Sequence, residues 1–455
     1  MAEGRGARRL RAGATASNIT PALGVSLSGT IMQIGPARHI HDELHARALV
    51  LDDGTTRIAL LTADATMICR EVFDQAKALA HKHTGIPIDH MLMAATHTHA
   101  APRVIGIGTG ELDKDYYAFL SRRMADAVRR AVHNLAPAEI AWGAASVPQF
   151  PQNRRWFVKP GTMPPNPFGG TNDQVLMYGN RKGIGVKAAG PVDPEFSVLA
   201  VRHADGRPLA LLGNYSIHYV GGYGRAEVSS DYFGCFAGCT RDALEAGALD
   251  PPFVGILSNG TFGDTGGVGG GYSAMRRVAG ALAKEARRLW DGMAWRDRVG
   301  LAMRETEIEV GVRRPDAARL AWARNLPAKP AGGKPHPWRK IYAREAILLS
   351  EYPARVSVKL QALRIGDLGI AAIPCEPFAE TGLAIKKHSP LKPTFTIGIA
   401  NGYHGYLPTP EQHKLGGYET WPARSSCLEA GAEPRIRAAV LDLLSQVGAD
   451  GRASS

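Results

Sequence analysis

Two histidines separated by one residue, His97 and His99, are the first residues of this sequence whose spacing suggests chemistry. They follow a short apolar run that begins at Met91 and they precede Pro102, so we predict a buried strand that ends in the pair. Because side chains alternate along a strand, both histidines are expected on the same face. Two imidazoles at a strand end suit a divalent metal ion. The competing interpretation, local hydrogen bonding only, stays open for a single motif.

The same pattern, a predicted buried strand that ends in a polar or metal-capable residue, recurs along the chain. If these strands share one sheet, their ends can meet in one pocket, which is how a zinc site is assembled from distant positions. The further strand ends of this kind are Asp64, His218, Asp264, Glu376 and the pair Tyr403 and Tyr406.

Hydrophobic periodicity and turn residues predict the elements that must position these side chains. Strands and helices alternate, which predicts an α/β fold: one large domain with mixed sheets flanked by helices. The stretch 145–192 is rich in Pro, Gly and Asn and is expected to be irregular and functional. Strands are expected at 57–64, 91–96, 196–203, 208–216, 253–257, 299–312, 356–365, 368–373 and 394–400, and helices at 72–83, 112–135, 232–246, 273–290, 340–350, 377–388 and 434–444.

Composition places the chain among ordinary globular proteins, with 45% hydrophobic and 21% charged residues in 455. No apolar run is long enough for a transmembrane segment. The basic N-terminus is not followed by the apolar region of a secretory signal, so a cytoplasmic location is expected. Five sparse cysteines fit a reducing compartment better than a disulfide framework.

The net charge of +12 permits an acidic partner such as nucleic acid. The basic residues are scattered, however, and no basic run is interleaved with aromatic residues. We therefore expect no nucleic-acid partner and interpret most of the charge as solvated surface. A nucleic-acid-binding protein stays the most distant of the alternatives.

Further motifs surround the histidines and the strand ends. Together they resemble the motifs of the catalytic domain in the neutral/alkaline non-lysosomal ceramidase family, and the similarity extends from about residue 13 to 444. The motifs that carry the resemblance are Thr96-His97-Thr98-His99, Asn153-Arg154, Ser216-Ile217-His218, Ser229-Ser230-Asp231, Ser258-Asn259 with Gly263-Asp264, Glu376 after Pro374, and Asn401, Tyr406 and Tyr418-Glu419. By this resemblance the catalytic domain spans 13–446, between a disordered basic tail at 1–12 and a disordered tail at 447–455.

The resemblance implies that His97, His218, Glu376 and Tyr406 bind a metal ion. Two imidazoles, a carboxylate and a phenol suit Zn²⁺ with one position left open for water. Zinc lowers the pKa of such a water to about 7, which makes it a nucleophile at neutral pH.

The resemblance also assigns roles around the metal. His99 would move a proton or polarise the substrate, and Arg154 and Tyr418 would stabilise an oxyanion. Because Arg154 stands in a polar, irregular stretch, we expect it to contribute to substrate binding or oxyanion stabilisation and not to the stability of the fold. Three acidic residues, Asp64, Asp231 and Asp264, have two possible roles. They could orient the metal ligands, or they could only cap loops and form turns.

The sequence departs from the family pattern in two ways. The family's serine, two residues after Gly-Asp, is Gly266 here, and Thr265 is one residue early, so we expect attack by activated water and no protein nucleophile. The chain also stops soon after the catalytic region, without the C-terminal β-sandwich domain of the family. The expected substrate is therefore an N-acyl compound that is ceramide-like or smaller.

We therefore predict a zinc-dependent amidohydrolase that acts on linear amide bonds of a small-molecule substrate. One alternative is zinc-dependent cleavage of an ester, a lactone or another bond in a small polar molecule. Another is a non-catalytic binding protein that retains the fold. A homo-oligomeric assembly is left open.

Overall fold

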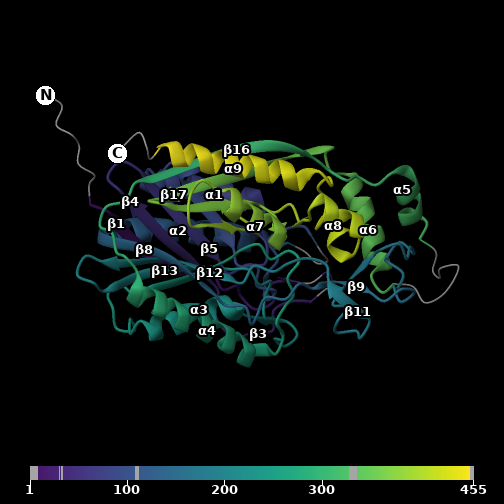
Figure 1. The fold of residues 1–455 in the computed structure, drawn as a ribbon, viewed down its shortest axis with the longest axis horizontal. Coiled ribbons are helices and arrows are strands. Elements are labelled where there is room, and N and C mark those ends of the chain that lie inside the picture. The colour runs from purple at the N-terminus through teal and green to yellow at the C-terminus, as the bar shows by residue number, and fades with distance from the viewer. Residues whose placement is uncertain (1–8, 30, 32–33, 108–111, 327–335, 451–455) are drawn as a thin grey trace.

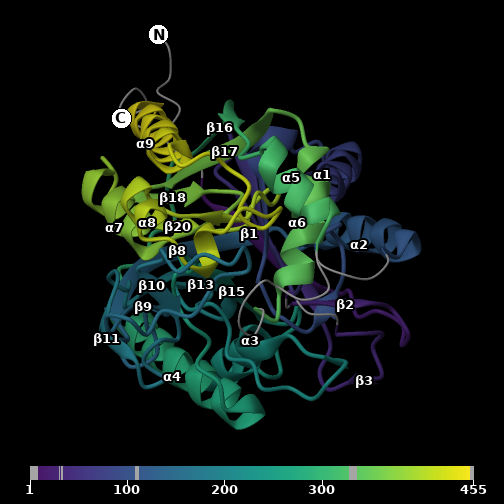
Figure 2. The same ribbon diagram turned by 90° about the vertical axis from the view of Figure 1, so that its right-hand side faces the viewer.

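Two β-sheets packed face to face form the centre of the computed structural model, which describes residues 9–29, 31, 34–107, 112–326 and 336–450. Helices cover the outer face of each sheet, so the molecule has four layers: helices, sheet, sheet, helices. Figure 1 shows α9 along one side of the molecule and α3 and α4 along the opposite side. Figure 2 gives the same layers seen from one end.

The larger sheet has eight strands in the order β15-β13-β12-β8-β1-β4-β5-β6. The pairs β13–β15 and β5–β6 are parallel, and the other neighbours are antiparallel. Its strands are β1 (Arg11–Asn18), β4 (His45–Asp52), β5 (Arg57–Ala63), β6 (Met91–Ala95), β8 (Ala136–Ser146), β12 (Glu195–His203), β13 (Pro208–Tyr215) and β15 (Val254–Asn259).

The second sheet has four strands in the order β16-β17-β18-β20, and three strands in the order β10-β9-β11 form a small sheet. The strands of these two sheets are β16 (Leu301–Gly311), β17 (Arg355–Ile365), β18 (Leu368–Ala372), β20 (Thr394–Ile397), β9 (Arg155–Val158), β10 (Val175–Met177) and β11 (Gly185–Ala188). Three two-stranded pairs join β2 (Leu27–Ser28) to β7 (Ala101–Pro102), β3 (His39–Ile40) to β14 (Glu227–Val228), and β19 (Glu376–Pro377) to β21 (Tyr406–Leu407).

Helices α1 to α4 pack on the larger sheet, and α7 and α9 pack against the core of the second sheet. The elements β9, β11, α5, α6 and α8 gather at one end of the two sheets (Figure 1). The helices are α1 (Arg70–Thr84), α2 (Lys114–His133), α3 (Asp231–Ala243), α4 (Gly271–Gly292), α5 (Ala317–Arg324), α6 (Arg339–Ser350), α7 (Ala379–His388), α8 (Pro410–Leu415) and α9 (Ala432–Asp450), with short 3-10 helices η1 (Ile88–His90) and η2 (Tyr418–Thr420).

Side-chain alternation explains the layers. In β4, Ala48 and Val50 belong to the core shared with α1 and α2, whereas Leu49 and Leu51 belong to the core between the sheets. Because both faces of the strand are covered, it is apolar at successive positions and shows no polar alternation. A strand that is apolar at successive positions is recognisable in the sequence as a continuous hydrophobic run.

The predicted α/β class with mixed sheets flanked by helices is confirmed, and so are the hairpins around Gly206 and Gly366. The strands that carry the candidate site residues do not share one sheet, because the chain builds an eight-stranded sheet, a four-stranded sheet and several smaller ones. The stretch 145–192 is not wholly irregular, since it contains β9, β10 and β11. Strand β1 begins and helix α9 ends a few residues inside the predicted tails, and residues 1–8 and 451–455 of these tails lie outside the described residues.

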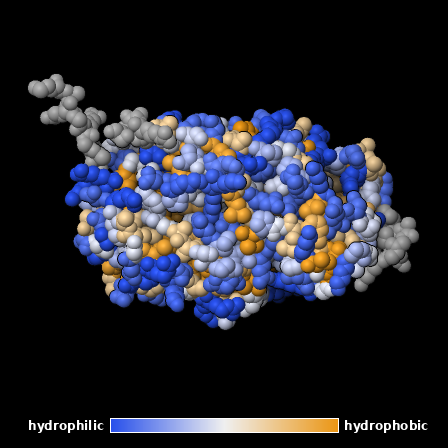
Figure 3. Space-filling model, in the orientation of Figure 1, coloured by the Kyte–Doolittle hydropathy of each residue, from blue (hydrophilic) through white to orange (hydrophobic). Residues whose placement is uncertain are grey.

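On the face shown in Figure 3, hydrophobic residues form scattered patches among hydrophilic ones. Among the described residues, no helix has the length and apolar character needed to cross a membrane.

Candidate metal centre

Three histidines from two distant segments meet in the interior of the protein. The Nε2 atom of His97 lies 3.2 Å from Nε2 of His218 and 3.2 Å from Nε2 of His99. The ligand atoms of all three lie within 4.8 Å of one another. The structure therefore brings together the predicted ligands His97 and His218 with the predicted proton carrier His99.

The backbone after β6 brings two of these rings together, although not in the predicted way. The strand ends at Ala95, and His97 has a φ of 72°, in the left-handed region. The pair thus stands in a turn beyond the strand, and the expectation that it shares a strand face is wrong. The turn is held by backbone hydrogen bonds from Thr96 to Ala63 and from His97 to Ala65, each 2.9 Å long.

A backbone carbonyl fixes the orientation of His97. Its Nδ1 lies 2.7 Å from the carbonyl oxygen of Thr66, and because a carbonyl only accepts, Nδ1 carries the proton. The lone pair is then on Nε2, which faces the other two rings. Nδ1 of His218 lies 3.3 Å from the carbonyl of Phe262.

Burial disfavours the charged form of His99 and of His218. Desolvation, followed by the proximity of His97 and Arg154, lowers the pKa of His99 well below its usual value. Desolvation and then Arg154 do the same to the pKa of His218. Neutral imidazoles are the form that binds a metal ion.

A carboxylate completes the cluster. The parallel pair β19–β21 sets Glu376 directly opposite Tyr406. Glu376 Oε2 lies 3.5 Å from Nε2 of His97 and 3.8 Å from Nε2 of His218, while Oε1 accepts a 2.6 Å hydrogen bond from Tyr403. Among the described residues, Oε2 has no hydrogen-bond partner although it is buried.

A buried carboxylate oxygen without a partner is costly, because it has lost its water. Here it faces nitrogen lone pairs, and a cation between them would satisfy all of these atoms. Imidazole and carboxylate ligands of this kind fit Zn²⁺. The residues present therefore fit a metal ion.

Tyr406 and Tyr418 line the same cavity of about 70 Å³ as His97, His99 and Glu376. Burial and then the nearby Glu376 raise the pKa of Tyr406 well above its usual value. The ring centroid of Tyr418 lies 5.8 Å from that of Tyr406. Both predicted tyrosines thus lie at the cluster.

Arg154 also reaches the cluster, but its setting differs from the expected one. Its Nη1 lies 3.3 Å from Nδ1 of His218, and its Nη2 donates to the carbonyl of Gly263 at 2.9 Å. The side chain is 3% exposed and its Nε lies 2.6 Å from Oε1 of Glu419. Arg154 is therefore held in a buried ion pair as well as facing the cluster, and its predicted role toward the substrate stays a prediction.

Glu419 is a residue to which the sequence assigned no role. Its second oxygen lies 2.8 Å from Nη1 of Arg155, so one carboxylate forms ion pairs with two neighbouring arginines. Burial opposes the charged form, but Arg154 and Arg155 together lower the pKa of Glu419. Glu419 belongs to the motif Tyr418-Glu419, so the sequence marks the residue itself. Nothing in the sequence indicates that it pairs with Arg154 and Arg155.

The three acidic residues Asp64, Asp231 and Asp264 hold loops. Asp64 accepts from Arg47 at 2.7 Å, and Asp231 accepts from the backbone N–H groups of Val220 and Gly221, just after His218. Within the part of the chain that the structure describes, none of the three hydrogen-bonds to a histidine of the cluster. Of the two predicted roles, the arrangement therefore corresponds to loop formation, and the carbonyls of Thr66 and Phe262 stand where ligand-orienting acids were expected.

Asp264 ties the loop after β15 to Arg154. Its carboxylate accepts from Asn153 Nδ2 at 2.8 Å and from the N–H of Ala379 at 2.9 Å, and its carbonyl accepts from the N–H of Arg154. Burial raises its pKa to about 7, as burial raises the pKa of Asp231 to about 6. Asp264 thus holds the segment that carries Arg154.

Thr265 is hydrogen-bonded within its own loop. Its hydroxyl donates to the carbonyl of Phe262 at 2.9 Å, and the side chain is buried. A Cβ added to Gly266 would meet the ring of Tyr178 at 2.9 Å, so that position is closed to a larger side chain unless the ring moves.

The fold and this cluster define a two-sheet protein with a buried candidate metal centre. A sequence model of the neutral/alkaline non-lysosomal ceramidase family, N-terminal part, matches residues 11–272. Because the match covers more than half of the 455 residues, the chain belongs to this family of hydrolases.

Two solved structures share the fold. The crystal structure of neutral ceramidase from Pseudomonas aeruginosa has a TM-score of 0.69 and 17% identity, over 98% of this chain and 75% of that chain. A structure described as ceramidase complexed with C2 has a TM-score of 0.68 and 16% identity, over 98% of this chain and 76% of that chain. At these identities the likeness concerns the fold, and the family membership rests on the sequence match.

Proposed function

We propose that this protein is a zinc-dependent hydrolase that cleaves the amide bond of an N-acyl compound. The single observation that carries the proposal is the buried, unpartnered Oε2 of Glu376, which faces Nε2 of His97 and His218. Family membership supports hydrolysis as the reaction class. Bound among these residues, Zn²⁺ would supply a Lewis acid and an activated water at neutral pH.

His97, His218, Glu376 and Tyr406 would hold the ion. A metal-binding histidine almost always has its other ring nitrogen held by a hydrogen bond. Nδ1 of His97 and of His218 each face a backbone carbonyl, whereas Nδ1 of His99 has no partner among the described residues. Because its Nδ1 is not held in this way, His99 is the histidine assigned to carry a proton between water and the leaving amine.

Arg154 and Tyr418 would stabilise negative charge on the substrate. Both line or approach the cluster from the side of Tyr406, with the Arg154 guanidinium 5.3 Å from the Tyr406 ring centroid and 5.8 Å from that of Tyr418. Fixed donors in a buried site are effective because they need no reorganisation during the reaction.

Metal analysis of variants tests this assignment. We expect about one zinc per chain in protein purified without chelator, little zinc in His97→Ala and Glu376→Ala, and retained zinc in His99→Ala. His203→Ala, which changes a histidine of β12, is the matched control and should retain zinc. Wild-type levels in Glu376→Ala would reject the ligand set.

Turnover is measured separately on a panel of N-acyl amides, esters and lactones. Hydrolysis of amides supports the proposed bond type. Hydrolysis of esters or lactones alone would move the function to the alternative substrate class, and a loaded but inactive protein would indicate a binding role.

A further inference from the structure

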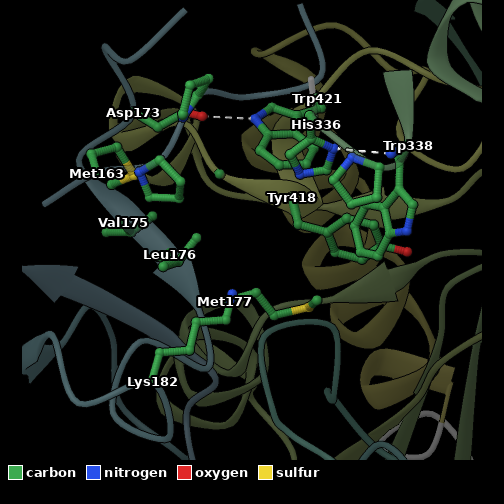
Figure 4. A pocket seen from close by; sticks show the side chains of 14 residues that line it. Met163, Asp173, Val175, Leu176, Met177, Lys182, His336, Trp338, Tyr418 and Trp421 are labelled. Atoms are coloured by element: carbon green, nitrogen blue, oxygen red, sulfur yellow. Dashed lines mark hydrogen bonds between the residues drawn. The ribbon is translucent and has the colours of Figure 1, made fainter. Parts of the chain in front are cut away.

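A second cavity, of about 180 Å³, adjoins the candidate metal centre. Figure 4 shows four rings on one side of it and aliphatic side chains on the other. We call this cavity the aromatic slot: its aromatic wall is His336, Trp338, Tyr418 and Trp421, and its aliphatic wall is Met163, Val175, Leu176 and Met177.

The aromatic wall is a connected set of rings. The centroid of Trp338 lies 5.4 Å from that of His336 and 5.4 Å from that of Tyr418, and Trp421 lies 5.6 Å from His336 and 6.1 Å from Tyr418. Asp173 accepts a 3.0 Å hydrogen bond from Nε1 of Trp421 and fixes that ring. The wall is therefore preorganised, which reduces the entropy lost when a ligand binds.

Tyr418 connects the slot with the metal centre, because it lines both cavities. The centroid of its ring lies 5.8 Å from that of Tyr406 on the metal side and 5.4 Å from that of Trp338 on the slot side. The slot and the metal centre are thus neighbouring cavities that share one wall, the side chain of Tyr418.

We propose that the aromatic slot binds a compact, uncharged aromatic ring of the substrate, which makes arylacyl or arylalkyl amides the preferred N-acyl compounds. This inference rests on the proposed amide hydrolysis. A dry apolar cavity of about 150 Å³ holds benzene, so a slot of about 180 Å³ fits one ring with one or two attached carbons. Most of a long alkyl chain would have to lie outside it.

The lining favours a neutral ring over a cation. Rings gain from edge-to-face contact with other rings, and methionine sulfur gains from contact with rings. Asp173 is the acidic residue of the lining, but its carboxylate already accepts from Trp421 and Asn166. Lys182 lines the slot as well and would repel a cationic group.

Binding is tested without turnover, by ligand-observed NMR titration of phenylacetamide, with hexanamide as the aliphatic comparison. Trp338→Leu should weaken phenylacetamide binding about fivefold, which is the size of one lost ring contact. Trp290→Leu, a half-buried tryptophan of α4 outside the slot, should leave it unchanged. Met163→Trp, which fills the slot from its partly exposed edge, should also weaken phenylacetamide binding. If Trp338→Leu does not fold, this second variant tests whether phenylacetamide binds in the slot.

Turnover then separates the two proposals. We expect kcat/KM for phenylacetyl ethanolamide, or for N-benzylacetamide if the ring belongs to the amine arm, to exceed that for hexadecanoyl ethanolamide at least about tenfold. Met163→Trp should reduce this preference, whereas Val186→Trp, on the exposed part of β11, should not.

The outcomes are distinct. Amide hydrolysis with preference for the hexadecanoyl compound, or phenylacetamide binding that is equal in wild type, Trp338→Leu and Met163→Trp, overturns the slot proposal and leaves the proposed function intact. Slot-dependent binding without hydrolysis of any amide rejects the proposed function while the slot stands.

Discussion

Replacing Glu419 by glutamine should destabilise the protein and weaken its metal site together. Glu419 is fully buried and forms the ion pairs with Arg154 and Arg155 at 2.6 and 2.8 Å. Glutamine retains the shape and one acceptor oxygen but removes the charge. Two buried guanidinium groups would then be left without their shared counter-ion.

The magnitude follows from what each arginine keeps. Arg155 retains hydrogen bonds to Gln412 and Gly416, whereas the hydrogen bonds that the Arg154 side chain retains among the described residues go to the carbonyl of Gly263 and to the ring of His218. Removing one partner of a buried pair typically costs about 3–5 kcal/mol, and we expect a loss in this range. The unbalanced charge of Arg154 beside His218 would also repel a cation, so zinc affinity should fall.

Unfolding in urea and zinc titration measure the two effects. Glu285→Gln is the matched control, because its pair with Arg288 is exposed, and it should change the stability by less than about 1 kcal/mol. A Glu419→Gln protein as stable as wild type would refute the role of Glu419 as the counter-ion that stabilises Arg154 and Arg155. Unchanged zinc affinity would show that the charge of Arg154 does not act on the histidine cluster.

The effect of Glu419 should depend on pH with a defined sign. The pKa of Glu419 in the folded protein is lowered from the ordinary 4.5, by Arg154 and Arg155 against the effect of burial. A carboxylate with a lowered pKa contributes stability that is complete above the unfolded value and is lost as the pH falls through the folded value. The stability difference between wild type and Glu419→Gln should therefore be full above pH about 4.5 and shrink below it.

Two further predictions concern the reaction and the metal. Thr265→Ala should keep most activity, because the Thr265 hydroxyl is hydrogen-bonded to the carbonyl of Phe262. His99→Ala, in contrast, should lose on the order of a hundredfold in kcat. An acyl adduct on Thr265 in mass spectra of the quenched reaction would contradict this prediction. Chelation should lower the melting temperature of the wild type but not of His97→Ala, because a ligand that binds only the folded state stabilises it. An equal shift in both proteins would place the metal elsewhere.

Most of the long elements are predictable from the sequence. The predicted strands are continuous apolar runs, because both of their faces are buried, and the predicted helices are amphipathic. Helix α1 ends at Thr84, as the following Gly85 predicts, and Gly85 takes the left-handed φ of 71° that favours glycine there. Strands β1, β4 and β8 were not predicted.

The candidate site is predictable in its residue types but not in its geometry. His97 at a φ of 72° occupies a conformation that a non-glycine residue takes only where the surrounding structure imposes it. The groups that orient the ligands are backbone carbonyls, which every residue possesses, so no residue type marks Thr66 or Phe262 in advance. Glu419 and Arg154 are likewise 265 positions apart, and no local pattern joins them.

The centre lies where the two sheets meet, and this explains why no single strand pattern encodes it. Ala94 of β6 bridges to Ala400, which follows β20 of the other sheet, and the N–H of Asn401 donates to the carbonyl of Met93 at 2.7 Å. The histidines therefore follow strands of the larger sheet, while Glu376 follows β18 of the second. A metal ion held by both would cross-link the sheets, so metal binding and the packing of the sheets should stabilise each other.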